Sequence, residues 1–571
     1  MINVFLLKNN RKIIYENGNE VEIDNIIKDI NIDFECKKFL KYIEDQKVNN
    51  LQIKDMYLWD GVEIYNFFRA SFTNVLKDII ENIILGEWIL KSLREKEFIV
   101  KTDSLLTFDI FKEILKCEYI EYEERNSLVQ PVKSNYIKIT KRFAKGIFNF
   151  FKYKTMKCKK DNILMLTQVG SINSLEIKGD KIIYDSLYGE LRQGLTEKSN
   201  LFETQFLNSK NMINKSELLG TKFFPFELIQ FFKKVEKRIT SIQVENKLNY
   251  IKELDYNYKN YNLKNIIEKE VIETIPSIYN SYILEIKVWE RILKFLKIDK
   301  IIVVDEADRI RCSIVAANRL NIQSFAIQHG LINETSSAYL IPSEDKILIP
   351  NTTFLWGNKF KEILIQNTSV YNEKNLEVVG QPRTDYLYKK MKDKKFNENS
   401  EKKILFVTQP IEDLAQGAIN ILCESLVDLK DYELIIKLHP ADKFHNIYEE
   451  CCIKNGIINY KIIKELDIYN ALIWCDVIIS VHSTVVLEGA ILNKPSICIL
   501  LPKYNDEGNF VKDGLSLGVN SSKDLYNLLN DIKSINKVNY KSFIEESFYS
   551  IDGMVYERII NKIIKGENKY A

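Results

Sequence analysis

The sequence has no large excess of one charge, no long apolar run and no C-x-x-C pair of cysteines of the kind that binds zinc. With 81 basic and 79 acidic residues the net charge is +2, which gives no global case for nucleic-acid binding. No uncharged apolar stretch is long enough to span a membrane, and the opening MINVFLLKNNRKIIYENG is too weakly apolar for a signal peptide. The nine cysteines are irregularly spaced without a C-x-x-C motif, so we expect reduced thiols and a cytoplasmic location.

Histidine is also scarce. The chain has four histidines, and none precedes His329. Three of them, His329, His439 and His482, lie at or just beyond the ends of predicted strands. Scarce histidines at such points indicate functional sites, although each one alone is compatible with an incidental polar residue at the start of a loop.

The length of the chain predicts more than one domain. Its 571 residues exceed what one core holds, and its composition is that of an ordinary globular protein. A charged segment near residues 389–402 has no apolar period and is typical of a linker. We therefore expect an N-terminal mixed α/β region, a basic amphipathic segment and two Rossmann-like domains, at residues 1–124, 125–160, 161–395 and 396–571.

An apolar run, Ile301–Val304, has the pattern of a buried parallel strand. Asp305, Glu306 and Asp308 follow it, at the strand end where open α/β sheets bind their ligands. Neighbouring carboxylates raise each other's pKa, which suits a general base that takes a proton from a sugar hydroxyl. Glu306 is the first candidate for this base and Asp305 the second. The alternative is that the acids complement the dipole of a helix that begins here.

A second short strand is predicted at 324–328, after an intervening helix, and it runs into Gln328-His329-Gly330. The two strands and the helix form a β-α-β unit with polar groups at both carboxyl ends. His329 is placed to contact a donor phosphate or sugar, and Gly330 permits close approach of the backbone.

The second half of the chain alternates strands and helices, as a Rossmann-like domain does. Strands are predicted at 403–407, 432–438, 477–480 and 495–500, and a further strand of the first half is expected at 346–349. Ser483 and Thr484 stand where a helix should begin. Backbone N–H groups and hydroxyls there favour an anion, although simple N-capping also explains the two residues.

Two further groups accompany this hydroxyl pair. Glu488 lies one turn along the same helix face, where its carboxylate either accepts hydrogen bonds from ribose hydroxyls or faces solvent. His439-Pro440 ends a neighbouring predicted strand, and an imidazole can donate a hydrogen bond to a phosphate oxygen. In this order on one α/β domain, the groups predict a nucleotide phosphate site.

Residues 125–160 contain no acidic side chain, while basic and aromatic residues alternate through the segment. Ile139, Phe143, Ile147 and Phe151 are spaced four apart. A helix here would carry an apolar stripe beside a basic face, as helices on anionic membranes do. We therefore predict an anionic membrane partner for residues 133–160; the alternative is a packed linker helix with solvated lysines. An aromatic-basic patch at 223–234 is similarly compatible with a core edge or a second contact.

Taken together, these motifs resemble GT-B glycosyltransferases of bacterial surface polysaccharides. The motifs are Q-H-G at 328–330, V-G-Q-P-R-T-D at 379–385, K-L-H-P at 437–440 and H-S-T-V-V-L-E-G-A-x-x-x-K-P at 482–495. They are most similar to the capsule Kdo-transferase and polysialyltransferase group, and more distantly to CDP-glycerol glycerophosphotransferases and UDP-N-acetylglucosamine 2-epimerases. The resemblance implies an α/β fold with two Rossmann-like domains facing a cleft, beside the extra N-terminal region.

The resemblance also implies roles for single residues. His439, Pro440, Ser483 and Thr484 would hold the phosphate of a CMP-linked donor, and Glu306 or Asp305 would be the base. Neighbouring motif positions extend the donor site to Gln409, Lys437, His482 and Glu488. Gln328, Gly330 and Arg383 are assigned to the acceptor side or to auxiliary roles. No D-x-D motif stands in the second half, so no metal and no cofactor are expected.

The leading functional hypothesis is transfer of a sugar from a nucleotide donor, such as CMP-Kdo or a CMP-nonulosonic acid, to a glycan or lipid-linked glycan at the inner face of the cell membrane. A UDP-N-acetylhexosamine 2-epimerase, a CDP-alditol phosphotransferase and a non-catalytic assembly partner are the alternatives. The epimerase needs no acceptor, and the assembly partner binds no nucleotide, so both are open to direct test.

Overall fold

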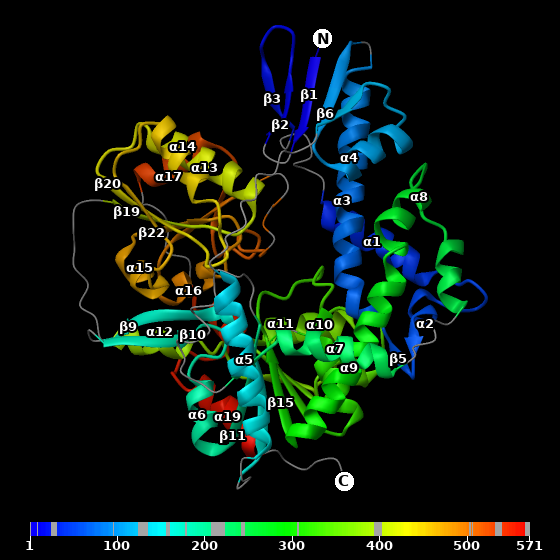
Figure 1. Ribbon diagram of the computed structural model, residues 1–571. Coiled ribbons are helices and arrows are strands. Elements are labelled where there is room, and N and C mark those ends of the chain that lie inside the picture. The colour runs from blue at the N-terminus through cyan, green and yellow to red at the C-terminus, as the bar shows by residue number, and fades with distance from the viewer. Residues whose placement is uncertain are drawn as a thin grey trace.

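The computed structural model has three regions that follow one another along the chain: an N-terminal region and two Rossmann-like domains (Figure 1). It describes residues 2–7, 10–23, 31–94, 96–123, 135–155, 160–177, 180–206, 223–240, 246–304, 306, 308–392, 402–501, 504, 506, 508–531 and 540–565. Asp305 and most of the predicted linker, residues 393–401, lie outside the described residues.

The N-terminal region forms a sheet of its own. Five strands occur in the order β3-β2-β1-β6-β7, with bounds Glu20–Glu22, Asn10–Ile14, Ile2–Leu7, Phe98–Thr102 and Ile120–Tyr122. The long helix α3, Tyr65–Ser92, leads from this sheet to the next domain (Figure 1). There Arg69 of α3 donates to the carbonyl of Leu340 at 2.8 Å, so the helix joins the two regions through a specific contact.

The first Rossmann-like domain is built on a seven-stranded sheet in which every pairing is parallel. Its strands, in the order β12-β11-β8-β15-β16-β17-β18, are Phe223–Pro225, Asn200–Phe206, Asn162–Gln168, Lys300–Val304, Gln323–Ile327, Thr352–Leu355 and Leu376–Val378. Strand β15 is buried along its whole length, as its unbroken apolar sequence predicts. Helices α9, Ile275–Leu296, and α10, Asp308–Arg319, pack against each other beside it.

The second Rossmann-like domain has six strands, also all parallel. In the order β21-β20-β19-β22-β23-β24 they are Tyr460–Ile463, Tyr432–Lys437, Lys402–Val407, Val477–Ser480, Ser496–Ile499 and Leu517–Val519. Both sheets start from a central strand, extend to one side and then reverse to the other, which is the doubly wound order. The predicted α/β class with two Rossmann-like domains is confirmed.

Two local features differ from the sequence predictions. Residues Lys346–Leu348 form a short 3-10 helix and not a strand, because Asp345 accepts a hydrogen bond from the backbone N–H of Ile347 and closes a turn there. The last helix, α19 (Val555–Lys565), returns to the first domain and packs on α6 (Leu191–Lys198) (Figure 1).

Asp385 fixes the start of the returning helix α19. Its carboxylate accepts hydrogen bonds from the backbone N–H groups of Val555 and Tyr556, at 3.0 and 2.9 Å. Burial raises the pKa of Asp385 to about 6, although these two hydrogen bonds act in the opposite direction. The apolar face of α19 then fills the core of the first domain, which ties the end of the chain to that domain.

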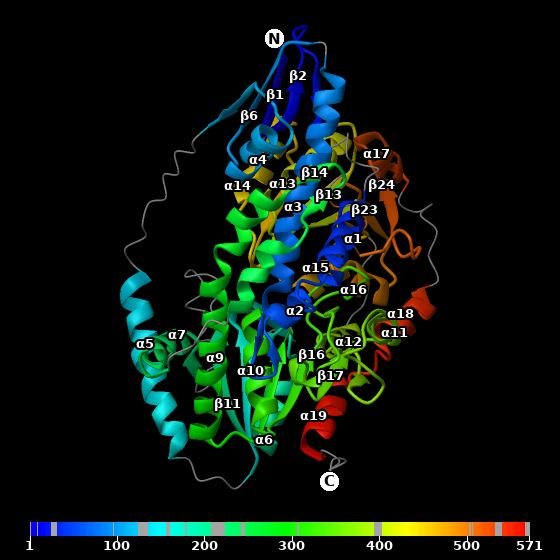
Figure 2. The ribbon, with the colours of Figure 1, turned by 90° about the vertical axis from the view of Figure 1, so that its right-hand side faces the viewer.

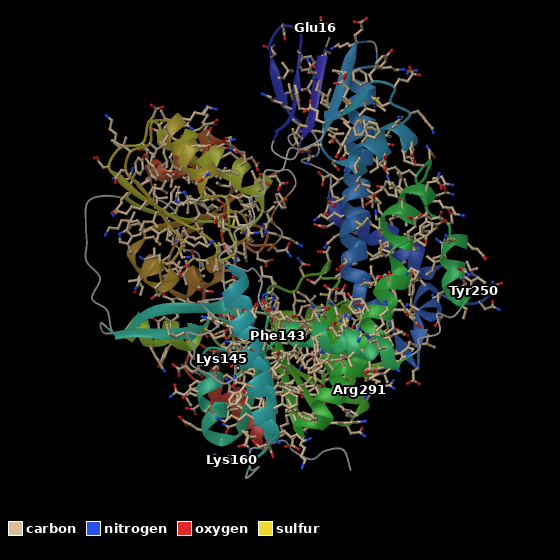
Figure 3. All side chains as sticks on the ribbon, in the orientation of Figure 1. Glu16, Phe143, Lys145, Lys160, Tyr250 and Arg291 are labelled. Atoms are coloured by element: carbon tan, nitrogen blue, oxygen red, sulfur yellow. The ribbon has the colours of Figure 1, made fainter. Side chains whose placement is uncertain are left out.

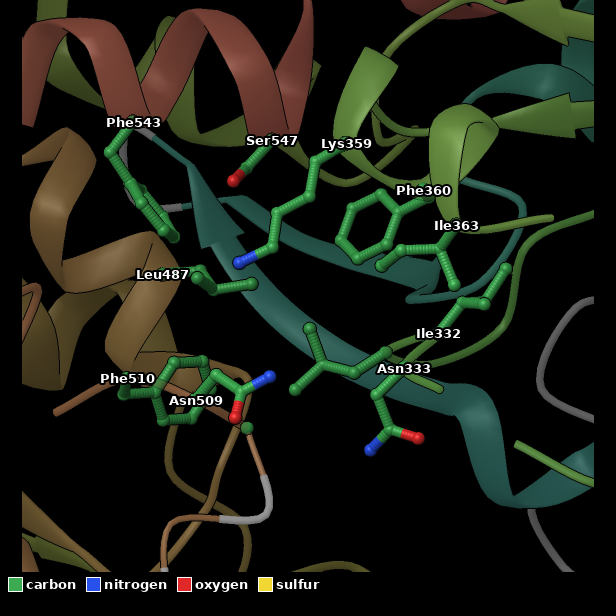
Figure 4. A pocket seen from close by; sticks show the side chains of 12 residues that line it. Ile332, Asn333, Lys359, Phe360, Ile363, Leu487, Asn509, Phe510, Phe543 and Ser547 are labelled. Carbon is green, nitrogen blue, oxygen red and sulfur yellow. The ribbon is translucent and has the colours of Figure 1, made fainter. Parts of the chain in front are cut away.

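An apolar crevice marks one contact between the Rossmann-like domains (Figure 4). Phe360 and Ile332 of the first domain face Leu487 and Phe510 of the second across it, and Phe543 of α18 (Tyr540–Phe548) closes one end. Its volume is about 20 Å³, so it admits little more than one water molecule and is not a ligand site.

None of the helices in the described part of the chain is both long enough and apolar enough to cross a membrane. All the cysteines among these residues are buried free thiols.

Candidate active site

The candidate site lies where the strand order of the second sheet reverses. Strands β19 and β22 are adjacent there, and their carboxyl ends lead into Thr408-Gln409 and His482-Ser483. Strand β20, on the other side of β19, leads into His439. Ligands of doubly wound sheets bind outside the strand ends at this reversal, because the loops there diverge and leave a crevice.

A cavity of about 180 Å³ occupies this place. The second domain supplies most of its wall, and the first domain adds Tyr184, Ser186 and Arg383. Among the residues of the second domain that line the cavity are Thr408, Lys437, His439, Pro440, Lys464, Asp467, Tyr469, Ser483, Thr484 and Glu488. Six of the predicted donor residues therefore share one cavity with Arg383: Lys437, His439, Pro440, Ser483, Thr484 and Glu488.

His439 is held as a neutral hydrogen-bond donor. Its Nδ1 accepts a hydrogen bond from the backbone N–H of Ala441 at 3.1 Å, so the proton of the neutral ring lies on Nε2. The residue is exposed at the cavity. The surrounding protein nevertheless removes part of the water around the ring, and this desolvation lowers its pKa to about 4, with the charge of Lys437 acting in the same direction. At neutral pH the ring therefore offers an N–H and carries no charge.

The loop under His439 is fixed by an acidic residue. Thr408 Oγ1 donates to Asp442 Oδ2 at 2.5 Å and accepts from the backbone N–H of His439 at 3.0 Å. Tyr448 also donates its hydroxyl proton to Asp442, at 2.8 Å. Because the carboxylate of Asp442 is used inside the protein, it orients the His439 loop and does not face a ligand.

Lys437 brings a positive charge to the cavity wall, while its ammonium group donates hydrogen bonds to the protein backbone. Its Nζ donates to the carbonyls of Leu438 and Lys464, at 2.7 and 3.0 Å, and the residue is buried. Lys464 in turn donates to the carbonyl of Asp442. Two ammonium groups are thus held in the cavity wall close enough to His439 to lower its pKa, and they favour an anion in the cavity.

Arg383 bridges the two domains at the other side of the cavity. Its Nε lies 2.6 Å from Glu488 Oε1, and its Nη2 donates to Thr484 Oγ1 at 2.9 Å. Ser483 Oγ accepts from the backbone N–H of Val485 at 3.3 Å, whereas Thr484, the N-cap residue of α16 (Val485–Ile491), makes no side-chain capping hydrogen bond to the described residues. Arg383 thus lines the same cavity as the predicted donor residues, whereas the sequence motifs assigned it to the acceptor side or to an auxiliary role.

Glu488 is fully buried in α16, Val485–Ile491, and still lines the cavity. Burial raises its pKa, and the charge of Arg383 opposes that rise. Apart from the ion pair with Arg383, neither of its carboxylate oxygens accepts a hydrogen bond from the residues that the structure describes. Oε2 therefore has unused acceptor capacity beside the cavity.

Tyrosines that the sequence did not single out form the remaining wall. Tyr184 at the end of β10 (Asp180–Asp185) lies against Tyr386, whose ring in turn lies against Tyr469, with centroid distances of 5.2 Å in both pairs. The Tyr184 hydroxyl is buried, and no described residue pairs with it. Burial raises its pKa well above the usual value, so it stays protonated and remains a potential donor. No sequence signal marks this residue, because it reaches the cavity only through the tertiary fold.

The structure places Glu306 inside the first domain. The side chain is fully buried, and its carboxylate accepts from Thr353 Oγ1 at 2.7 Å and from the hydroxyl of Tyr371. It does not line the cavity, so a role as the general base is not supported by its position. Glu306 is enclosed because Thr353 of β17 and Tyr371 in a following loop donate hydrogen bonds to its carboxylate from inside the domain. The sequence pattern showed that Glu306 follows a strand, but not that these donors surround it.

The Gln328-His329-Gly330 turn has a different arrangement. Gln328 Oε1 accepts from the backbone N–H of Trp356 at 2.9 Å, and its Nε2 donates to the carbonyl of Gly330 at 2.8 Å. These bonds hold the turn and leave His329 exposed, close enough to His439 that its charge lowers the pKa of that ring. The space beside Gly330 is open, so the protein itself does not require a glycine there.

Gln409 and His482 follow β19 and β22 but do not line the cavity. Burial lowers the pKa of His482 to about 4, and Lys77 of α3 in the N-terminal region contributes to this shift. The described residues contain no group of three or more His, Cys, Asp or Glu side chains that could hold a metal ion.

The comparison with known families concerns the second domain together with the last two strands of the first domain and helix α19. Residues 351–565 match the model of the family described as CDP-Glycerol:Poly(glycerophosphate) glycerophosphotransferase, which covers less than half of the chain. The match includes Arg383, His439 and Glu488 but neither Tyr184 nor His329. The family that matches is thus one that the motifs resemble more distantly. No curated protein matches the sequence.

Solved structures share the architecture at low identity. One is the S. aureus MnaA–UDP co-structure, with 14% identity, a TM-score of 0.44 and coverage of 72% of this chain and 97% of that chain. A putative UDP-N-acetylglucosamine 2-epimerase from Listeria monocytogenes has 13% identity, a TM-score of 0.45 and coverage of 72% and 98%. Acinetobacter baumannii MurG has 11% identity, a TM-score of 0.39 and coverage of 71% and 99%. Likeness at this level carries no information on the donor or the reaction.

Proposed function

We propose that this protein is a transferase that takes a group from a cytidine-nucleotide donor and passes it to a hydroxyl of a bacterial surface glycan, with CMP as the leaving group. The observation that carries the proposal is the cavity at the strand reversal, where a neutral His439 donor stands beside the ammonium groups of Lys437, which is buried, and Lys464, which is exposed, within the family-matched part of the chain. A site of this kind suits a phosphate whose negative charge grows as it leaves.

The cavity residues divide the binding of the donor among them. His439 donates its Nε2–H to a phosphate oxygen, and Lys437 and Lys464 stabilise the developing negative charge through space. Glu488 accepts a hydrogen bond from a ribose hydroxyl with its unused oxygen, and the ion pair with Arg383 opposes its protonation. The hydroxyl of Tyr184 closes the site from the first domain.

His329 is the proposed base for the acceptor hydroxyl. It belongs to the other domain, is exposed at a turn that Gln328 holds in place, and lies within electrostatic reach of His439. An imidazole there can take the proton of the attacking hydroxyl as the new bond forms. Glu306 is left with a structural role in the first domain.

The family match favours a CDP-linked alditol, such as CDP-glycerol, as the donor. In this reaction an acceptor oxygen bonds to the phosphorus of the polyol phosphate, the bond from that phosphorus to CMP breaks, and the proton passes to His329. The second candidate is a CMP-linked sugar such as CMP-Kdo, favoured by the His-Pro and Ser-Thr motifs that line the cavity. There the oxygen attacks the anomeric carbon, and CMP again leaves.

Release of CMP tests the proposal and separates the donors. The full chain is incubated with CDP-glycerol, CMP-Kdo or UDP-N-acetylglucosamine, with bacterial membranes as the source of acceptor. We expect CMP from CDP-glycerol only when membranes are present, and a loss of this release in His329→Ala and His439→Ala. Release from CMP-Kdo alone moves the assignment to the sugar transferase. Epimerisation of UDP-N-acetylglucosamine without acceptor, or no stabilisation by CMP, CDP or UDP in thermal unfolding, rejects the proposal.

A further inference from the structure

Two helices of the first domain expose an unusual set of large apolar side chains. Helix α5, Asn135–Lys154, exposes Phe148 and Phe151 by 66% and 55%, and α7, Glu227–Ile239, exposes Phe231 and Ile239 by 49% and 64%. Val235 of α7 is exposed as well. The helices pack side by side, and both views place α5 on the outside of the domain (Figures 1 and 2). We call these five side chains and the basic residues around them the α5–α7 surface.

Helix α5 is fixed to the domain, so this exposure does not arise from a loosely attached helix. Gly146 lies so close to Pro225 that a Cβ atom would come within 1.9 Å of its ring. Asn149 donates to the carbonyl of Phe223 at 2.9 Å, and the ring of Phe150 stacks on Phe295 at 5.2 Å. One face of α5 is therefore core, as the linker alternative predicts, while the neighbouring face with Phe148 and Phe151 stays open.

The exposed charges of the α5–α7 surface all have one sign. On the described parts of the two helices, every exposed charged side chain is basic: Lys141, Lys145, Lys152, Lys154, Lys234, Lys237 and Arg238. Figure 3 shows Lys145 beside Phe143 on α5. The acids of α7 are neutralised, since Glu236 is buried and 2.7 Å from Arg291, and Glu227 lies 3.7 Å from Arg142.

We propose that the α5–α7 surface docks the protein on an anionic phospholipid bilayer, with the aromatic and aliphatic side chains in the interface and the lysines on the headgroups. Exposed aromatic side chains can enter the boundary between headgroups and acyl chains, and basic side chains beside them can bind the negatively charged headgroups. A second copy of the chain is a poor occupant because the two faces would bring like charges together. The surface lies outside the cavity, so the inference goes beyond the proposed reaction and concerns where an acceptor is met.

Vesicle sedimentation of the full chain tests this surface. We expect binding to vesicles that contain phosphatidylglycerol, weak binding to vesicles of phosphatidylcholine alone, and loss of binding at high salt. Phe231→Ser with Ile239→Ser on α7 should weaken binding by about tenfold or more, and so should Lys141→Glu with Lys152→Glu on α5. The matched control is Ile458→Ser, which removes an apolar side chain that is 92% exposed on the second domain.

Several outcomes would overturn the assignment. Wild-type binding by both double variants rules the surface out, and equal binding to neutral and anionic vesicles removes the role of the lysines. A wild-type dimer that both double variants convert to monomer would assign the surface to a second copy instead. Thermal stabilisation by CMP shows that each variant is folded. If CMP does not stabilise the wild type, this result counts against the proposed reaction, and the membrane inference is then decided by vesicle sedimentation alone.

Discussion

The two Rossmann-like domains have the same kind of strand order but use their strand ends differently. In the second domain, Thr408 after β19 accepts from the backbone N–H of His439 after β20, and the ring of His439 lines a cavity with only its Nδ1 in a hydrogen bond to the described backbone. In the first domain, Glu306 follows β15 and is enclosed, with Thr353 and Tyr371 as its donors. A polar residue at a strand end is therefore a site residue only where the protein leaves part of its hydrogen-bonding capacity unused.

The largest expected effect is on the rate of CMP release, and it concerns the strand-end site of the second domain. His439→Ala should lower the rate of CMP release by about 10²–10³-fold, since it removes the neutral donor to the leaving phosphate. His445→Ala is the matched control, because His445 is a half-exposed histidine of α14 (His445–Lys454) that does not line the cavity. Equal rates for His439→Ala and the wild type would show that the cavity is not the donor site.

The next effect concerns the first domain. Glu306→Ala should lower the free energy of unfolding by about 3 kcal/mol, because it leaves the buried hydroxyls of Thr353 and Tyr371 without their acceptor. We expect CMP release by the folded fraction to remain within a fewfold of wild type. A variant with unchanged melting temperature and no activity would instead restore Glu306 as the base.

Tyr184→Phe tests whether the first domain reaches the donor. Removal of the hydroxyl should raise the Kd for CMP by about fivefold, which corresponds to one modest hydrogen bond. Tyr57→Phe is the control, because Tyr57 also has a buried hydroxyl without a partner among the described residues, yet lies in the N-terminal region. A similar Kd in both variants would remove Tyr184 from the site.

Stability should depend on pH through the burial of His482 in the second domain. His482 is held neutral, with its pKa lowered from 6.5 to about 4. Between these values the unfolded chain binds the proton and the folded chain does not, so the free energy of unfolding falls as pH drops from 6.5 to 4. The contribution is at most about 1.4 kcal/mol per pH unit. His439 has the same shift and adds to this dependence, so His482→Gln should reduce the slope in denaturation curves without abolishing it, and an unchanged slope would show that His482 does not contribute.

The smallest expected effect is that of metal removal. With no D-x-D motif in the second half, CMP release should change by less than about twofold after EDTA treatment, because protein groups supply the positive charge at the phosphate. An EDTA-sensitive rate that Mg²⁺ restores would contradict metal-independent transfer.

Much of the architecture could be read from the chain because it depends on local patterns. The apolar run at Ile301–Val304 became the buried strand β15, and the strands that precede His329, His439 and His482 lie as their sequences predict. The strand predicted at 346–349 is wrong because Asp345 closes a turn by a side-chain hydrogen bond, which outweighs the β-forming preference of the isoleucines.

The histidines and the Ser483-Thr484 pair could be found from their positions after strands, since parallel strands bring their carboxyl ends to one edge. Tyr184, Asp467 and Tyr469 could not, because nothing in their local sequence marks them and they meet only when the first domain and the second domain pack together. The basic segment had two interpretations, core or membrane face; the structure shows that one side of α5 is core and that the other side is exposed, and the membrane contact of the exposed side stays a proposal.

By itself, then, the sequence determined the α/β class and the strand ends at which chemistry is expected, because the alternation of apolar runs with polar turns encodes both. Only the tertiary structure decided which strand-end groups keep a free hydrogen-bonding atom. His439 and Glu306 look alike as polar residues after buried strands. The neighbours that satisfy Glu306 come from β17 and Tyr371, more than 40 residues away in sequence, and no local pattern reports them.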